Sequence, residues 1–193
     1  MYKNTDVLAG DVSNVIAVWN RASDQRKIDG ALWYEDARQI GRDLDRTFDL
    51  RDGSGAGILA ALSPSTAWEV NVSEAWALCK SGWSRRQSKA NNVKALAIRD
   101  GANPDDILGG NKVKAFYACI VNNDAKRACI DRHAVAVYVG RHVTDAEQKG
   151  LSRVDVYDRI AEAYQLAADQ IGVSVEVVQA VTWVQWRAEK GLS

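Results

Sequence analysis

The sequence predicts an all-α protein, and three observations carry that prediction. Apolar residues recur at helical spacing along most of the 193 residues, as in Leu8, Val12, Val15, Ile16 and Trp19. Only two prolines occur, so long helices are permitted. No hairpin dipeptide lies between alternating strand patterns. We therefore expect a single helical domain over residues 1–193.

The expected elements follow one another along the chain. Flanking helices are predicted within residues 5–48 and 152–189, around a core at about 57–141. In the core we expect helices at 57–62, 68–79, 84–99, 112–121 and 131–139, with a short one starting at Asn103-Pro104. Ser152 should cap the long helix that ends at Gly172, and Ser174 should start the last one. The Val-rich start of that last segment also fits a strand, but its length favours a helix.

Composition narrows the class of protein. About 47% of the residues are hydrophobic, enough for a packed core, yet no apolar run approaches the length that spans a bilayer. The N-terminus lacks the pattern of a signal peptide, so we expect a cytoplasmic protein with no membrane partner. The three cysteines are widely spaced and only two histidines occur, so neither a metal site nor a cofactor is expected. The oligomeric state stays open.

Charge is unevenly distributed although the formal net charge is zero. Residues 80–132 hold 11 Lys+Arg and 5 Asp+Glu, a net charge of +6. The segments on either side are acidic, with net charges of −4 and −2. A basic middle within an acidic frame is typical of a local phosphate-facing surface, although an ordinary solvated face fits the same pattern.

Two neighbouring segments could carry chemistry. Residues 107–115 read as a glycine hairpin between two helices, where free N–H groups at the second helix could hold a phosphate beside Lys112 and Lys114. A plain glycine helix end is the competing interpretation. Asp131 then starts a helix after an apolar stretch, so its carboxylate could stabilise a sugar cation, or simply cap the helix.

A third segment lies near the C-terminus. Trp183 and Trp186 are three residues apart with Arg187 beside them. They could form a platform on which a base stacks, with Arg187 on phosphate. An aromatic pair that closes the helical core is the alternative.

Three segments in order resemble the helix-hairpin-helix DNA glycosylase superfamily, to which endonuclease III belongs. They are Ser88-Lys89-Ala90-Asn91-Asn92-Val93, Leu108-Gly109-Gly110-Asn111 through Ala115, and Ile130-Asp131-Arg132-His133. Upstream, Ala61-Leu62-Ser63-Pro64 with Val70-Asn71 is similar to a helix pair of that family. The resemblance covers roughly residues 57–141.

The resemblance implies a glycosylase-like helical fold and assigns roles to residues. Asp131 would be the catalytic carboxylate, and Gly109, Gly110 and Asn111 would contact DNA phosphate through their backbone. Val113 stands where bifunctional members keep a nucleophilic Lys, so Schiff-base strand cleavage is not expected. The duplex-penetrating Gln and the four-cysteine cluster of the family are absent.

These observations lead to one preferred function and two alternatives. We expect a monofunctional N-glycosidase acting on a base in DNA, in a pocket between residues 57–80 and 109–139. Asp131 is the catalytic candidate. The candidates for DNA contact are Gly109, Gly110, Asn111, Lys112, Lys114, Lys89 and Arg132, and those for the base pocket are Trp68, Asn71, Trp183 and Trp186. One alternative is a base-hypermodification transferase on the same fold, because some phage-encoded proteins of such pathways resemble glycosylases yet transfer groups to a modified base. The other is a non-catalytic helix-hairpin-helix module that binds DNA or a protein.

Overall fold

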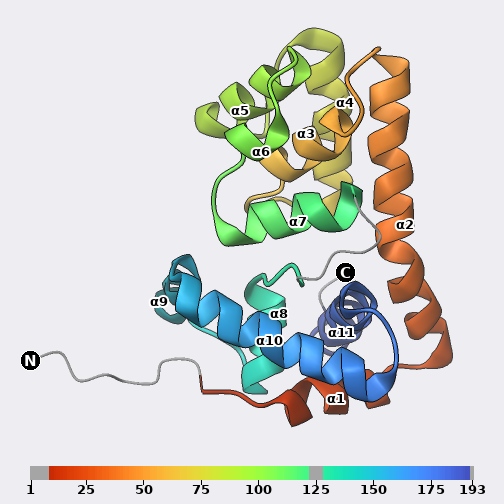
Figure 1. Ribbon diagram of the computed structural model, residues 1–193, viewed down its shortest axis with the longest axis vertical. Helices are drawn as coiled ribbons and strands as arrows, with labels where there is room; N and C mark the ends of the chain where they lie inside the picture. Colours follow the sequence, from red (N-terminus) through yellow and green to blue (C-terminus); the bar gives the residue numbers. More distant parts are fainter. Residues whose placement is uncertain (1–8, 122–127, 192–193) are drawn as a thin grey trace, which may run out of the picture. The chain divides into compact units, whose positions relative to one another are not determined.

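The computed structural model describes residues 9–121 and 128–191, and within these ranges every regular element is a helix. The elements are α1 (Val12–Arg21), α2 (Asp24–Thr47), α3 (Ser54–Leu62), α4 (Trp68–Ser81), α5 (Lys89–Arg99), α6 (Pro104–Ile107), α7 (Asn111–Val121), α8 (Arg132–Val139), α9 (Asp145–Gln148), the 3-10 helix η1 (Lys149–Ser152), α10 (Val154–Ile171) and α11 (Val175–Glu189) (Figure 1). The all-α prediction is thus confirmed for the described residues. None of these helices is long and apolar enough to cross a membrane.

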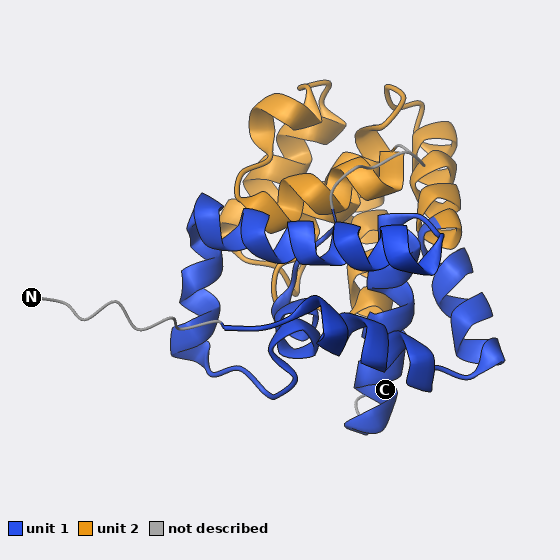
Figure 2. Ribbon diagram, turned by 60° about the horizontal axis from the view of Figure 1, so that its bottom comes forward, with its two compact units in different colours: residues 1–34, 124–193 blue, residues 35–123 orange. Residues whose placement is uncertain are grey.

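The chain forms two compact units (Figure 2). Unit 1 consists of residues 1–34 and 124–193, and unit 2 of residues 35–123. The continuous helix α2 contributes its first part to unit 1 and its second part to unit 2. The division does not test whether the chain is a single helical domain, which stays a prediction.

Unit 2 is built around α3, whose nine residues are all buried. This short apolar helix packs against α4, α5 and α7. Small residues make the close packing possible: a Cβ atom at Gly55 would collide with the carbonyl oxygen of Gly41 on α2, and one at Gly57 would lie 2.7 Å from Pro104. The small residues of the sequence Ser-Gly-Ala-Gly let the backbone of α3 approach its neighbours closely. The helix can therefore be fully buried.

Unit 1 packs α1 against α8, α10 and α11. The apolar stripe of α1 turns Val15 and Val18 inward, and α10 buries Tyr157 and Tyr164 completely. Gly30 lets α2 approach α11, because a Cβ atom there would lie 2.5 Å from the Val181 side chain. The predicted catalytic carboxylate, that of Asp131, lies at the start of α8 in this unit.

Three helix starts differ from the prediction. α3 begins at Ser54, three residues before the expected start at 57. α5 begins at Lys89, not near residue 84, because Ser88 caps it by accepting a hydrogen bond from the Asn91 N–H. α10 begins at Val154 and has no side-chain cap. Ser152 lies instead in η1, where its hydroxyl donates to the Lys149 carbonyl. A serine just before a helix can hydrogen-bond to the preceding turn or cap the helix. The sequence pattern alone does not decide which of the two bonds it makes.

Candidate functional site

The predicted hairpin lies in unit 2 and has the expected form. Asn103 caps the one-turn helix α6 with Pro104 at its first position, buried Leu108 follows, and α7 begins at Asn111. Only Gly110 has a positive φ, +81°, and a Cβ atom at that position would meet nothing within 4 Å. Asn111 lies within α7 and is not among the positive-φ residues, so a second glycine is not required. The outer side of this hairpin is open.

Lysines surround the hairpin. Lys94 on α5 places its Nζ 3.8 Å from where a Cβ of Gly109 would lie. Lys114 on α7 is exposed and Lys112 is partly exposed. Since a helix leaves its first N–H groups without partners inside the helix, the start of α7 combines backbone donors with nearby positive charge. This combination suits a phosphate oxygen.

Buried polar groups order the loop before α5, a feature that the sequence analysis missed. Glu74 on α4 accepts hydrogen bonds from the Ser84 hydroxyl at 2.5 Å and the Arg86 N–H at 3.1 Å. Asn92 on α5 accepts from the Ser84 N–H and donates to the Ser84 carbonyl. Burial acts to raise the pKa of Glu74, but these hydrogen bonds together hold it below its usual value. The loop is therefore held from both sides, and exposed Lys89 follows it at the start of α5.

Asp131 lies in unit 1 as the N-cap of α8, and both of its carboxylate oxygens are engaged. Oδ1 accepts from the Ala134 N–H at 2.8 Å, and Oδ2 accepts from the Trp183 Nε1–H on α11 at 3.1 Å. The residue itself stays partly exposed. The carboxylate is thus fixed in orientation and still reaches solvent.

Two buried tyrosines of α10 hold the segment that leads into α8. The Tyr157 hydroxyl accepts from the Ile130 N–H at 3.0 Å and donates to the Ala128 carbonyl at 2.9 Å. The Tyr164 hydroxyl donates to the Ala134 carbonyl at 3.1 Å. Both side chains are fully buried, so they fix the backbone on either side of Asp131.

Aromatic rings and a positive charge pack around Trp183, the indole partner of Asp131. The guanidinium of Arg187 lies over the Trp183 ring, 4.2 Å from its centroid. Trp33 of α2 packs at 6.0 Å from the same ring, and His133 meets it edge-on at 6.2 Å. Burial lowers the pKa of His133, with the neighbouring arginines acting in the same direction and Asp131 opposing them. Asp131, Trp183 and Arg187, with His133 and Trp33 around them, form what we call the Asp131 cluster.

Comparison with known proteins places the chain in a family. Its sequence matches the family of unknown function DUF7178 over residues 4–190. The chain belongs to that family. No curated protein and no solved structure matches it.

The remaining site candidates of this DUF7178 member occupy varied surroundings. Arg132 is committed to α9, pairing with Asp145 and donating to Gln148. Trp186 is only 4% exposed. In unit 2, Trp68 is partly buried against Phe116, and Asn71 is 2% exposed with its amide donating to the Leu59 carbonyl.

The predicted pocket thus draws on residues of both units. Within unit 1 the structure brings Asp131 and Trp183 together, and within unit 2 it brings the hairpin and its lysines together. How the two sets combine stays a prediction. No signal in the sequence pointed to the place of Trp33 beside Trp183.

The cysteines of the DUF7178 chain are free thiols. Burial raises the pKa of the Cys79 thiol to about 11, which keeps it protonated and unreactive at neutral pH. Across residues 9–121 and 128–191, no group of three or more His, Cys, Asp or Glu side chains could hold a metal ion.

Proposed function

We propose that the chain is a DNA-acting enzyme of the N-glycosidase type, on a glycosylase-like helical fold. The observation that carries the proposal is the Asp131 cluster, in which a fixed, partly exposed carboxylate accepts from an indole N–H and a guanidinium lies over the same indole ring. The hairpin of unit 2 supports it independently, because its geometry suits a DNA phosphate.

The proposed role of Asp131 follows from the negative charge of its carboxylate. Cleavage of a base–sugar bond develops positive charge on the sugar, and a nearby carboxylate held in place stabilises that charge. The N–H groups of Ala134 and Trp183 orient Asp131 without removing its charge. Arg187 supplies a cation for a phosphate of the same nucleotide, and the aromatic rings supply a surface for an extruded base.

The test is turnover by the Asp131→Asn variant. Asparagine caps a helix about as well as aspartate, so the fold should survive while the charge is lost. Wild type incubated with oligonucleotides that carry modified bases should release a free base, detected by mass. The variant should be slower by at least about 100-fold, the usual cost of removing a group that stabilises transition-state charge.

Asp11→Asn is the matched control for the loss of a capping charge. Asp11 caps α1 in the same unit by accepting from the Ser13 N–H at 2.7 Å. This variant should keep full activity. Equal turnover by wild type and Asp131→Asn would remove the catalytic role.

A non-catalytic DNA-binding module is the second candidate, and one observation favours it. Both Asp131 oxygens already accept hydrogen bonds from the protein, which is what a purely structural cap requires. This candidate predicts that wild type binds DNA through the hairpin and releases no base from any substrate. It also predicts that Asp131→Asn leaves DNA affinity unchanged.

A further inference from the structure

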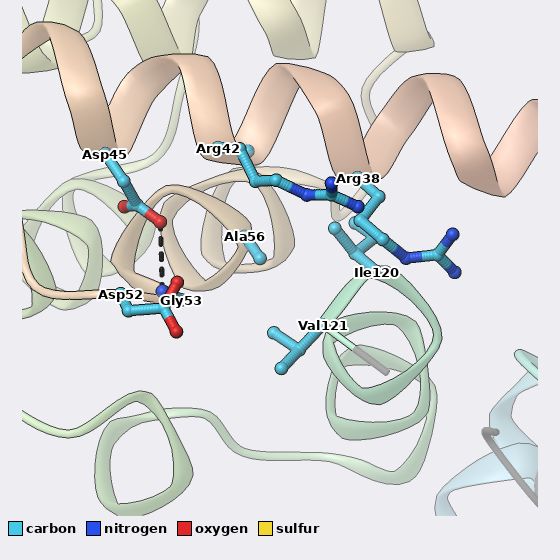
Figure 3. A pocket seen from close by; sticks show the side chains of 9 residues that line it. Arg38, Arg42, Asp45, Asp52, Gly53, Ala56, Ile120 and Val121 are labelled. Atoms are coloured by element: carbon cyan, nitrogen blue, oxygen red, sulfur yellow. Dashed lines mark hydrogen bonds between the residues drawn. The ribbon is translucent and has the colours of Figure 1, made fainter. Parts of the chain in front are cut away.

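Unit 2 contains a pocket that lies apart from the hairpin and that the proposed function does not use. Its volume is about 250 Å³, and it is lined by Arg38, Gly41, Arg42, Asp45, Asp52, Gly53, Ala56, Ile120 and Val121 (Figure 3). These residues come from α2, the loop before α3, the first turn of α3 and the end of α7. The pocket would hold roughly eight water molecules, which is the size of a small metabolite.

The pocket is hollow because of its small residues, and its walls are fixed. Gly41 and Ala56 offer almost no side chain where α2 meets α3. Gly53 has a φ of +82°, a conformation that favours glycine. Asp45 pins the adjoining loop, because its two oxygens accept from the Gly53 N–H at 2.9 Å and the Gly55 N–H at 2.5 Å. The cavity is therefore pre-formed.

Two guanidinium groups lie toward one side of the pocket. Arg38 is only 6% exposed; its Nη1 pairs with Glu35 at 2.6 Å and its Nη2 donates to the Cys119 carbonyl at 3.3 Å. Its buried Nε has no hydrogen-bond partner among the described residues. Arg42 is half exposed and lies 3.8 Å from Glu35, a loose pairing. A buried donor without a partner is costly, and an anionic ligand would relieve that cost.

Two carboxylates lie toward the other side. Figure 3 shows Asp45 and Asp52 grouped at the loop before α3, away from the arginines, with Ala56 and Val121 between the two groups. Burial raises the pKa of Asp45, although its hydrogen bonds oppose this, and the charge of Asp52 raises it further. A cation placed between these two side chains would offset their repulsion.

We propose that this pocket binds a small zwitterion, a molecule of at most about nine non-hydrogen atoms with a carboxylate at one end and a protonated amine at the other. The arginines receive the carboxylate, for which a guanidinium is the best-matched donor. Asp45 and Asp52 receive the amine. Ile120 and Val121 contact the methylene groups between the two charges. The site does not depend on the proposed DNA chemistry.

The test uses the full chain and a series of linear ω-amino acids from glycine to 6-aminohexanoate, with butyrate and butylamine as single-charge analogues. Binding is followed by calorimetry and by NMR shifts of the lining residues. One member of the series should bind at least tenfold more tightly than either analogue. Arg42→Gln and Asp52→Asn should each weaken that binding by tenfold or more.

Arg46→Gln is the matched control. Arg46 lies one turn beyond Arg42 on α2, does not line the pocket and pairs with Asp43 at 2.8 Å. This variant should bind the amino acid as wild type does. The proposal is overturned if butyrate binds as tightly as the best amino acid, which would indicate a simple anion site, or if no member of the series binds more tightly than its analogues.

Discussion

The side chain of Asp131 joins two helices through two hydrogen bonds of different kinds. Oδ1 caps α8 locally, whereas Oδ2 accepts from the Trp183 indole, 52 residues away in the sequence. A capping residue at position 131 follows from the sequence, because a carboxylate before an apolar helical stretch is a strong start signal. The indole partner does not follow from it, since it depends on how α8 and α11 pack.

A double-mutant cycle measures that long-range bond. We expect Asp131→Asn and Trp183→Phe to be coupled by about 1 kcal/mol in the free energy of unfolding, because a partly exposed hydrogen bond to a charged group contributes about that much. Chemical denaturation of the four proteins gives the value. The cycle of Asp11→Asn with Trp183→Phe is the control and should be additive. Additivity in both cycles would show that the indole contributes nothing to holding Asp131.

The imidazole of His133 gives a second residue-scale prediction. Burial is the main cause that lowers its pKa, with Arg187, Arg132 and His142 acting in the same direction. The folded state therefore binds a proton less readily than the unfolded state. The contribution of His133 to stability is complete above the pKa of the unfolded state, about 6.5. It is lost as the pH falls from that value through the lower pKa of the folded state. NMR titration should give a midpoint below 6.5, and His133→Gln should flatten the fall in stability. A midpoint at or above 6.5 would contradict this.

Among the elements, most helices could be predicted from spacing and caps. Asn103-Pro104 starts α6, Asp131 starts α8 and Gly172 ends α10 with a φ of +83°, each as its local chemistry requires. The start of α5 could not be placed correctly, because the loop before it is ordered by Glu74 and Asn92, whose burial appears only in three dimensions. Local signals predict local structure, whereas a buried polar network depends on tertiary packing.

The hairpin between α6 and α7 yields a prediction about an element. Gly110→Ala should destabilise the protein by about 1 kcal/mol, since an L-residue at positive φ is strained even where space is free. It should also weaken DNA binding by distorting the hairpin. Gly109→Ala is the control, because Gly109 lacks positive φ and the nearest atom to its added Cβ is Lys94 Nζ at 3.8 Å. Thermal unfolding and a binding titration check both. Equal behaviour of the two variants would show that the turn geometry is unimportant.

At the scale of the whole molecule, the all-α class could be predicted and the division into two units could not. Helical periodicity runs without a linker through the boundary, because α2 itself belongs to both units. The zwitterion pocket was also missed, since Arg38, Arg42 and Asp45 read in sequence as an ordinary charged helix face. Their role depends on Gly53, in the loop after α2, and on the end of α7, which lies far away along the chain.

The distribution of charge over the molecule supports the central claim, that this DUF7178 chain acts on DNA. The net charge of +6 falls in residues 80–132, and the hairpin with Lys94, Lys112 and Lys114 lies within them. Binding to phosphates releases counterions, so affinity should fall steeply with salt. The logarithm of the affinity should fall linearly with the logarithm of the salt concentration, with a slope of about −0.9 for each phosphate neutralised. Such contacts carry no base information.

The most direct measurement is the salt dependence of duplex DNA affinity for wild type and for the double variant Lys112→Ala/Lys114→Ala. We expect the variant to bind all sequences more weakly and to flatten the slope by about 1.8, if each lysine neutralises one phosphate. Replacing both lysines by Arg should restore the slope. Lys27→Ala/Lys149→Ala, which removes the same charge outside residues 80–132, should leave it unchanged. A wild type that does not bind DNA, or a hairpin variant with wild-type affinity and slope, would contradict the account.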